Sequence, residues 1–184
     1  MLQPPPRPSP AQLRAAAGRT VPDLIAPELR VLFCGINPGL YTGATGYHFA
    51  RPGNRFWPTL HAAGFTPRRL QPWEEAELLP LGYGITSLVA RATATADALA
   101  PAELVAGAAT LVANVATHRP RTVAVLGISA YRTAFQRPRA VVGLQAERLH
   151  EAALWVLPNP SGLNAHYSAA ALASVYAELR AAIV

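Results

Sequence analysis

The segment Arg30-Val31-Leu32-Phe33-Cys34-Gly35-Ile36-Asn37-Pro38-Gly39 is an apolar run that ends in a polar turn. An apolar run without alternation is typical of a strand that is buried on both faces. Residues 122–127 and 154–157 have the same character, and helical patterns separate the three runs. Strands that alternate with helices predict an α/β fold with three α/β/α layers around a short, mostly parallel central sheet.

The helical patterns are clearest over 101–118 and 168–182, where apolar residues recur on one face. Asn54 is a favourable N-cap for a further helix over 55–63. Between the first strand and this helix, residues 37–53 are expected to form a long glycine-bearing loop. Ligands of open α/β sheets bind at the carboxyl ends of the strands, so polar turns at that edge are candidate functional elements.

The domain organisation follows from length and composition. Residues 1–19 are expected to be a Pro-rich N-terminal segment with a short helix, and residues 20–184 a single domain. No apolar run reaches the roughly 20 residues that a bilayer span needs, so no membrane association is expected. Met1–Ala11 lacks the apolar core of a secretory signal, and we expect a cytoplasmic protein.

The charged residues point to a polyanionic partner. The net charge is +6, and all 16 basic residues are arginines. Arginine forks pair with phosphate in two-point geometry, although a compositional bias towards Arg and Ala would leave the same excess. The absence of lysine excludes a Schiff-base step through that residue. The single cysteine, Cys34, excludes an intrachain disulfide and is expected to be a buried core residue.

The turn Gly35–Gly39 fits no common phosphate-binding loop. A dinucleotide fingerprint would need G-x-G-x-x-G opening into a helix, and a Walker loop would need a lysine. Taken alone, the turn is explained equally well as a structural turn and as part of a functional site. The long segment that follows is rich in glycine and aromatic residues, which allow close backbone approach and stacking on a flat ligand. Its length and aromatic content favour a functional loop.

Three motifs then resemble one family. Gly35-Ile36-Asn37-Pro38-Gly39, Gly46-Tyr47-His48-Phe49-Ala50 and Asn54-Arg55-Phe56-Trp57 are similar to those of the mismatch-specific uracil-DNA glycosylases and the related thymine-DNA glycosylases. The resemblance extends from about Arg30 to the end of the chain. It implies a uracil-DNA glycosylase-like fold and hydrolysis of an N-glycosidic bond in DNA, without metal or other cofactor.

The resemblance assigns Asn37 as the catalytic residue. An amide cannot act as a general base, but its carbonyl can orient a water molecule. Backbone N–H groups of the same turn would stabilise the departing pyrimidine anion. The base pocket implied by the resemblance is built from Gly35, Ile36, Gly39, Thr42 and Phe49, with Phe49 stacking on the extruded base. The volume near Tyr41 would decide between uracil, thymine and ethenocytosine.

A second turn, Pro158-Asn159-Pro160-Ser161-Gly162-Leu163, resembles the intercalation loop of that family. Leu163 would fill the gap that the extruded base leaves in the stack, and Ser161 and Gly162 would approach the DNA backbone. The family pattern has a basic residue a few positions further on. Here Ala165 takes that place, and the adjacent His166 is a candidate for the missing contact. A strand end followed by a helix N-terminus is the structural alternative for this turn.

Three more residues belong to the expected functional edge. Ser87 and Arg91 follow a short strand over 83–86 and are candidates for phosphate contacts, although a plain loop would also explain them. Asp97 is the acid nearest to this segment and would assist water activation if the loop folds inwards.

Two hypotheses follow. The first is a monofunctional glycosylase, acting as a monomer in base excision repair on double-stranded DNA with a flipped-out uracil mispaired with guanine. The second is a non-catalytic module of the same fold that binds damaged DNA or nucleotides. A nucleotide binder has no need of a wedge such as Leu163, so the presence of both turns favours the enzyme.

Overall fold

A computed structural model describes residues 3–183 and contains a five-stranded sheet in the order β2-β1-β3-β5-β4. The strands are β1 Val31–Gly35, β2 Tyr83–Ser87, β3 Thr122–Leu126, β4 Gly143–Leu149 and β5 Ala152–Leu157. The pairs β1–β2, β1–β3 and β3–β5 are parallel, and β4 joins β5 in antiparallel orientation. The carboxyl ends of four strands therefore lie along one edge.

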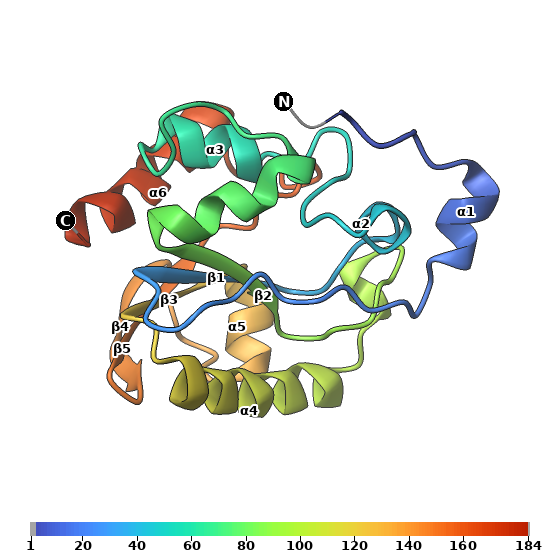
Figure 1. The fold of residues 1–184 in the computed structure, drawn as a ribbon. Coiled ribbons are helices and arrows are strands. Elements are labelled where there is room, and N and C mark those ends of the chain that lie inside the picture. Colours follow the sequence, from blue (N-terminus) through green and yellow to red (C-terminus); the bar gives the residue numbers. More distant parts are fainter. Residues whose placement is uncertain (1–2, 184) are drawn as a thin grey trace.

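Helices cover both faces of the sheet (Figure 1). The α-helices are α1 Pro10–Ala15, α2 Leu40–Thr45, α3 Phe56–Ala62, α4 Pro101–His118, α5 Ile128–Ala134 and α6 Ala169–Ala182, and the 3₁₀-helices are η1 Pro72–Leu81 and η2 Ala96–Ala98. One layer contains α3, η1 and α6, and the opposite layer contains α4 and α5. The predicted three-layer α/β/α fold is confirmed.

The hydrophobic core explains why the strand sequences do not alternate. Val31 and Phe33 pack with the layer of α3 and α6, while Leu32 and Cys34 pack with α4 and α5. All four side chains are fully buried, so both faces of β1 demand apolar residues. The predicted burial of Cys34 is confirmed, and burial is the main cause that raises the pKa of its thiol, followed by the charge of Asp23.

The structure corrects the sequence interpretation at two places. The expected loop over residues 37–53 contains the short helix α2, whose N-cap Gly39 offers no side-chain hydrogen bond and whose residues have weak helical propensity. Strand β4 was not predicted, because it is an edge strand with mostly exposed or half-buried residues and so lacks an apolar pattern.

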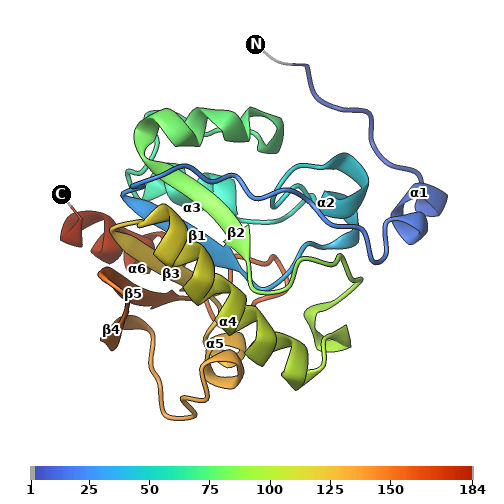
Figure 2. The ribbon, with the colours of Figure 1, turned by 60° about the horizontal axis from the view of Figure 1, so that its bottom comes forward.

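The N-terminal segment packs on the domain (Figure 2). Helix α1 begins with a capping box between Ser9 and Gln12, as expected for a short helix in this segment, and it contacts α2. Gly18 donates its N–H to the Ala92 carbonyl at 2.8 Å, and the Ala92 N–H donates to the Arg19 carbonyl at 2.8 Å. Among residues 3–183, none of the helices combines the length and hydropathy that a membrane span requires.

Candidate active site

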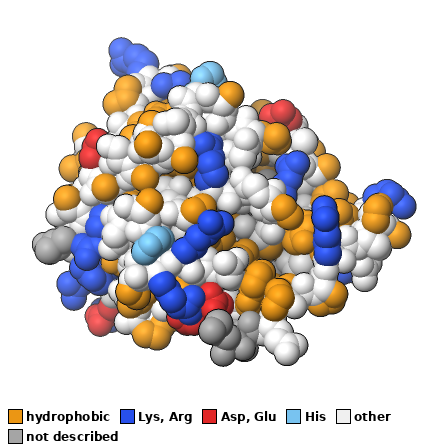
Figure 3. Space-filling model, turned by 90° about the horizontal axis from the view of Figure 1, so that it is seen from above, with side chains coloured by type: hydrophobic (Ala, Val, Ile, Leu, Met, Phe, Trp, Pro, Cys, Tyr) orange, Lys and Arg blue, Asp and Glu red, His pale blue; other side chains and the backbone are white. Residues whose placement is uncertain are grey.

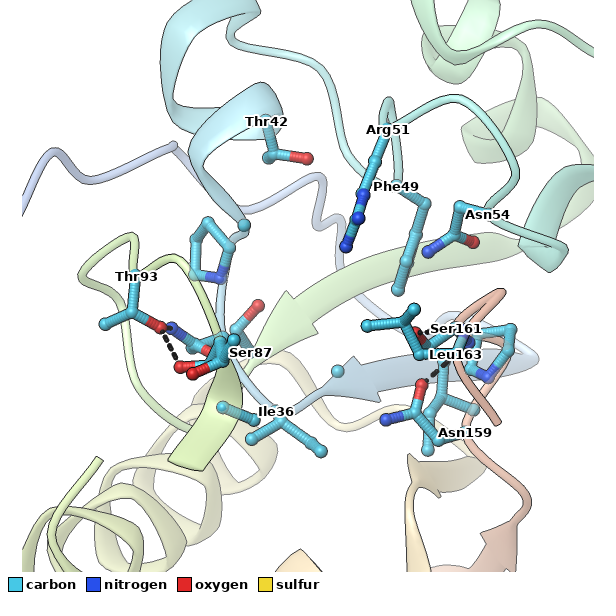
Figure 4. Close-up of a pocket in the computed structure, with 18 of the residues that line it drawn as sticks. Ile36, Thr42, Phe49, Arg51, Asn54, Ser87, Thr93, Asn159, Ser161 and Leu163 are labelled. Carbon is cyan, nitrogen blue, oxygen red and sulfur yellow. Dashed lines mark hydrogen bonds between the residues drawn. The ribbon is translucent and has the colours of Figure 1, made fainter. Parts of the chain in front are cut away.

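A cavity of about 310 Å³ opens at the carboxyl edge of the sheet (Figure 4). Its walls come from the ends of β1 and β2, from residues 93–97 and from the turn after β5. The structure brings most of the predicted site residues together here, and those that line the cavity are Gly35, Ile36, Asn37, Gly39, Thr42, Phe49, Ser87, Ser161 and Leu163. The two turns singled out in the sequence therefore share one cavity.

The Asn37 carboxamide is held in one orientation. Its Nδ2 donates to the Arg91 carbonyl at 3.0 Å and to Thr93 Oγ1 at 2.8 Å. A carbonyl can only accept, so the amino group must face Arg91 and Oδ1 must face the other way. Within the described residues Oδ1 has no hydrogen-bond partner and is not sealed from solvent. The amide therefore presents a free acceptor in a residue that lines the cavity.

Phe49 forms an aromatic wall of the cavity. One face of its ring stacks on Phe56, with ring centroids 4.1 Å apart and an interplanar angle of 22°. A Cβ atom on Gly35 would lie 3.3 Å from Phe49 Cζ, so a glycine lets the ring approach the end of β1. Phe49 also has a φ of 53°, a conformation that costs of order 1–3 kcal/mol and is concentrated at functional sites. The fold thus strains the backbone where it presents this ring.

His48 was not predicted as a pocket residue. It is 5% exposed and lines the cavity next to Phe49. Its backbone N–H and its Nδ1 both bond to Glu75 Oε2, at 2.8 and 2.9 Å, and Trp57 Nε1 donates to its carbonyl at 3.0 Å. Glu75 lies 27 residues away in the chain, so no local pattern identifies this partner. The contacts fix the wall that carries Phe49.

The cavity also contains groups of opposite charge. Asp97 lines it from η2, and its side chain is exposed to solvent. The water-activation role of Asp97 stays a prediction, and its position in the cavity wall is compatible with it. Arg51 was not predicted, and its side chain points into the cavity beside Phe49 (Figure 4). A carboxylate and a guanidinium thus share the space in front of Asn37.

The second turn presents Leu163 at the rim. Its side chain is 71% exposed, the highest fraction among the exposed large apolar residues of the described chain. Asn159 Oδ1 accepts from the Ser161 N–H at 2.9 Å, and Ser161 Oγ accepts from the Leu163 N–H at 3.2 Å. These bonds shape the turn without covering the leucine. The exposure is what a wedge for the DNA stack requires.

Arg55 holds this turn from behind. Its Nη1 donates to the Tyr167 carbonyl at 2.6 Å, and its Nη2 donates to the carbonyls of Ser161 and Asn164 at 3.0 and 2.9 Å. The Arg55 Nε is buried without a partner among the described residues. A single guanidinium therefore gathers three carbonyls of the segment 161–167, defined here as the wedge loop.

Gly162, Arg91 and His166 do not line the cavity. Gly162 lies against the loop that contains Gly53. A Cβ atom on Gly162 would be 2.5 Å from the Gly53 carbonyl oxygen, so only glycine allows this approach. The Arg91 guanidinium pairs with Glu103, from Nε to Oε1 at 2.7 Å and from Nη2 to Oε2 at 2.9 Å. Its expected phosphate contact would require breaking this pair, and the contribution of Arg91 to the site is its carbonyl. His166 is exposed on the wedge loop, and its contact with DNA stays a prediction.

The described residues offer no group of three or more His, Cys, Asp or Glu side chains that would hold a metal ion. The polar groups in the cavity wall include the Asn37 carbonyl, the Asp97 carboxylate and backbone amides. Such a set can orient and deprotonate a water molecule, and can stabilise an anion on a leaving group.

Comparison with known proteins agrees with this geometry. The model of the uracil DNA glycosylase superfamily matches residues 22–180. The fold is also similar to the solution NMR structure of a candidate uracil DNA glycosylase from Methanosarcina acetivorans, with a TM-score of 0.54 and 16% identity over 89% of this chain and 98% of that one. At that identity the likeness shows the fold alone. The family match includes both turns and the cavity between them, and the chain belongs to the uracil DNA glycosylase superfamily.

Proposed function

We propose that this protein is a monofunctional DNA glycosylase that releases uracil mispaired with guanine from double-stranded DNA. The observation that carries the proposal is the orientation of the Asn37 side chain, which lines the cavity. Its amino group donates two hydrogen bonds, and its Oδ1 has no partner among the described residues. A carbonyl acceptor fixed in this way can position a water molecule against C1′ of an extruded nucleotide.

The reaction is a hydrolysis. The water oxygen forms a bond to C1′ while the bond between C1′ and N1 of the base breaks, and the electron pair of that bond leaves on N1. The Asp97 carboxylate takes the proton of the water, since the Asn37 amide cannot accept it. Backbone N–H groups of the turn Gly35–Gly39 stabilise the base anion. Without lysine, no Schiff base to that residue forms at the abasic product.

The preference for a mispair follows from the cost of extrusion. Flipping a base costs a few kcal/mol, and the cost is least for a mispaired one. Phe49, which lines the cavity, would stack on the extruded base, and Leu163 would enter the gap left in the duplex. A site that relies on an amide to hold the water would depend strongly on such easily extruded substrates.

The test is base release from labelled duplexes that contain one G·U, G·T or A·U pair, with alkali cleavage of the abasic product as the readout. Under single-turnover conditions the parent protein is expected to release uracil fastest from G·U. The Asn37→Ala variant should lose this activity and keep most of its DNA affinity. Asn114→Ala is a matched control, because Asn114 lies on α4 and does not line the cavity. Release at the parent rate by Asn37→Ala would overturn the role of Asn37, and no release by the parent would favour a binding module.

A further inference from the structure

The arginines divide into paired and unpaired groups. Ion pairs to glutamates engage Arg68, Arg91, Arg119 and Arg137. Seven exposed arginines make neither an ion pair nor a side-chain hydrogen bond within residues 3–183, and they are Arg7, Arg14, Arg19, Arg51, Arg69, Arg121 and Arg139. An unpaired, exposed guanidinium is free to bind a phosphate in two-point geometry.

Three of the unpaired arginines, Arg7, Arg51 and Arg69, line two cavities that adjoin the candidate active site. Arg51 and Arg69 line one of about 230 Å³, together with Pro5. Arg7 and Arg51 line the next. Arg51 also lines the base cavity, so it stands where all three meet. No aspartate or glutamate lines either adjoining cavity, and the local field is therefore positive.

One face of the molecule also carries several arginine side chains (Figure 3). In the view from above Figure 1, arginine side chains cross the middle of the face, and acidic side chains lie largely towards its margins (Figure 3). A nucleotide whose base enters the cavity carries a phosphate on each side, and these phosphates must leave along the rim. The two adjoining cavities offer cations without a carboxylate in their lining, whereas Asp97 lies in the base cavity.

The segment that carries Arg7 is held in place by the fold. Prolines at positions 4, 5, 6 and 8 restrict its backbone, and the Ser9–Gln12 capping box ties it to α1. Helix α1 is fixed in turn by its contact with α2 and by the bonds of Gly18 and Arg19 to Ala92. This segment precedes residues 22–180, where the family model matches. It therefore lies outside the part of the chain that the family model matches.

We propose that Arg7, Arg51 and Arg69 form a phosphate track for the DNA strand that carries the extruded nucleotide. The N-terminal segment then extends the DNA-binding surface beyond the two turns at the cavity. The partner is a DNA backbone, bound through phosphate oxygens without base recognition. The inference rests on the proposed function for the identity of the polyanion, but its test needs no turnover.

The experiment measures the affinity of the full chain for a duplex with an abasic-site analogue opposite guanine, over a series of salt concentrations. Arg7→Ala, Arg69→Ala and the double variant are compared with the parent, while Arg51 is left intact because it lines the base cavity. Each lost phosphate contact should flatten the slope of log K against log salt by about 0.9, and the double variant should flatten it by about twice that.

Arg121→Ala is the matched control. Arg121 is also exposed, but it precedes β3 at the amino edge of the sheet, opposite the cavity. It should keep the parent slope. An unchanged slope in the double variant, or an equal loss in Arg121→Ala, would overturn the track. A protein that shows the expected slopes but releases no base would overturn the proposed function and leave the track standing.

Discussion

Thr93 Oγ1 accepts a hydrogen bond from Asn37 Nδ2 at 2.8 Å and donates its own hydrogen to the Thr95 carbonyl at 2.7 Å. The hydroxyl has one hydrogen, and because Thr95 takes it, Thr93 can only accept from Asn37. The direction of the bond is thus fixed by Thr95, which forms no hydrogen bond with Asn37 in the described residues. This chain of bonds orients the Asn37 carbonyl and makes Thr93 a positioning residue.

Thr93→Val should therefore slow base release without removing the reacting group. Valine keeps the shape but leaves one Nδ2 hydrogen unpaired, a loss of about 1–2 kcal/mol or roughly 5- to 30-fold in single-turnover rate. DNA affinity should stay near the parent value. Thr95→Val is the control, because only the Thr95 carbonyl takes part and its side chain is exposed. A parent-like rate for Thr93→Val would show that the hydroxyl does not position the amide.

Asp97→Asn tests the proton acceptor. The amide keeps the size of the side chain but cannot take the proton of the water, so the single-turnover rate should fall by about 10²–10⁴-fold. Affinity for G·U duplex should hold or rise, since a negative charge leaves the DNA-facing cavity. Glu178→Gln serves as the control, because Glu178 is exposed on α6 and makes no ion pair in the described chain. Equal rates for parent and Asp97→Asn would exclude Asp97 from the proton transfer.

The sequence predicted the features that depend on local pattern. An apolar run without alternation predicts the strand Val31–Gly35, and the turn that follows this strand contains Asn37. The position of Asn37 at the carboxyl edge then follows from parallel topology. The turn that contains Leu163 was placed at the same edge because it also follows a buried strand, whereas the roles of Asn37 and Leu163 came from the resemblance to the glycosylase family. Local pattern was sufficient wherever the strand itself places the residue.

The partners of these residues could not be predicted. Thr93 lies 56 residues from Asn37, and the Arg55 contacts to the wedge loop span more than 100 residues. A threonine or an arginine is compatible with many surroundings, so its type does not reveal which carbonyl or amide it will meet. Likewise, the Arg91–Glu103 pair forms because the fold brings the loop that contains Arg91 next to α4. This proximity is not visible in the sequence, which therefore predicted an unpaired arginine.

The Arg91–Glu103 pair predicts an acid-sensitive contribution to stability. The hydrogen bonds from Arg91, and then from the Ala100 N–H, lower the pKa of Glu103 from 4.5 to about 2. Since the folded-state pKa is below the unfolded one, the contribution is present above pH 4.5 and is lost as the pH falls towards about 2. Glu103→Gln should lower the Tm at pH 7, and the difference from the parent should shrink through that window. Thermal unfolding followed by circular dichroism measures this, and a difference that does not depend on pH would contradict it.

Arg55 and Leu163 should be coupled in catalysis. Arg55→Lys keeps the charge, but an ammonium cannot reproduce the fork that reaches the carbonyls of Ser161, Asn164 and Tyr167. The wedge loop should then lose its shape, and excision from a G·U duplex should fall about 10-fold or more, as expected for the loss of a charge-assisted hydrogen bond. A 2-aminopurine beside the uracil should report less unstacking.

A merely structural role for Arg55 would lower the Tm and slow excision equally in any background. Positioning of the wedge predicts instead that Arg55→Lys has little further effect on excision once Leu163→Ala has removed the wedge, while its effect on the Tm persists. The double-mutant cycle should give a coupling of about 0.5–3 kcal/mol in excision and near zero in stability. Additive effects on excision would contradict the coupling. Leu163→Ala alone should barely change the Tm, because the side chain is 71% exposed and buries little surface.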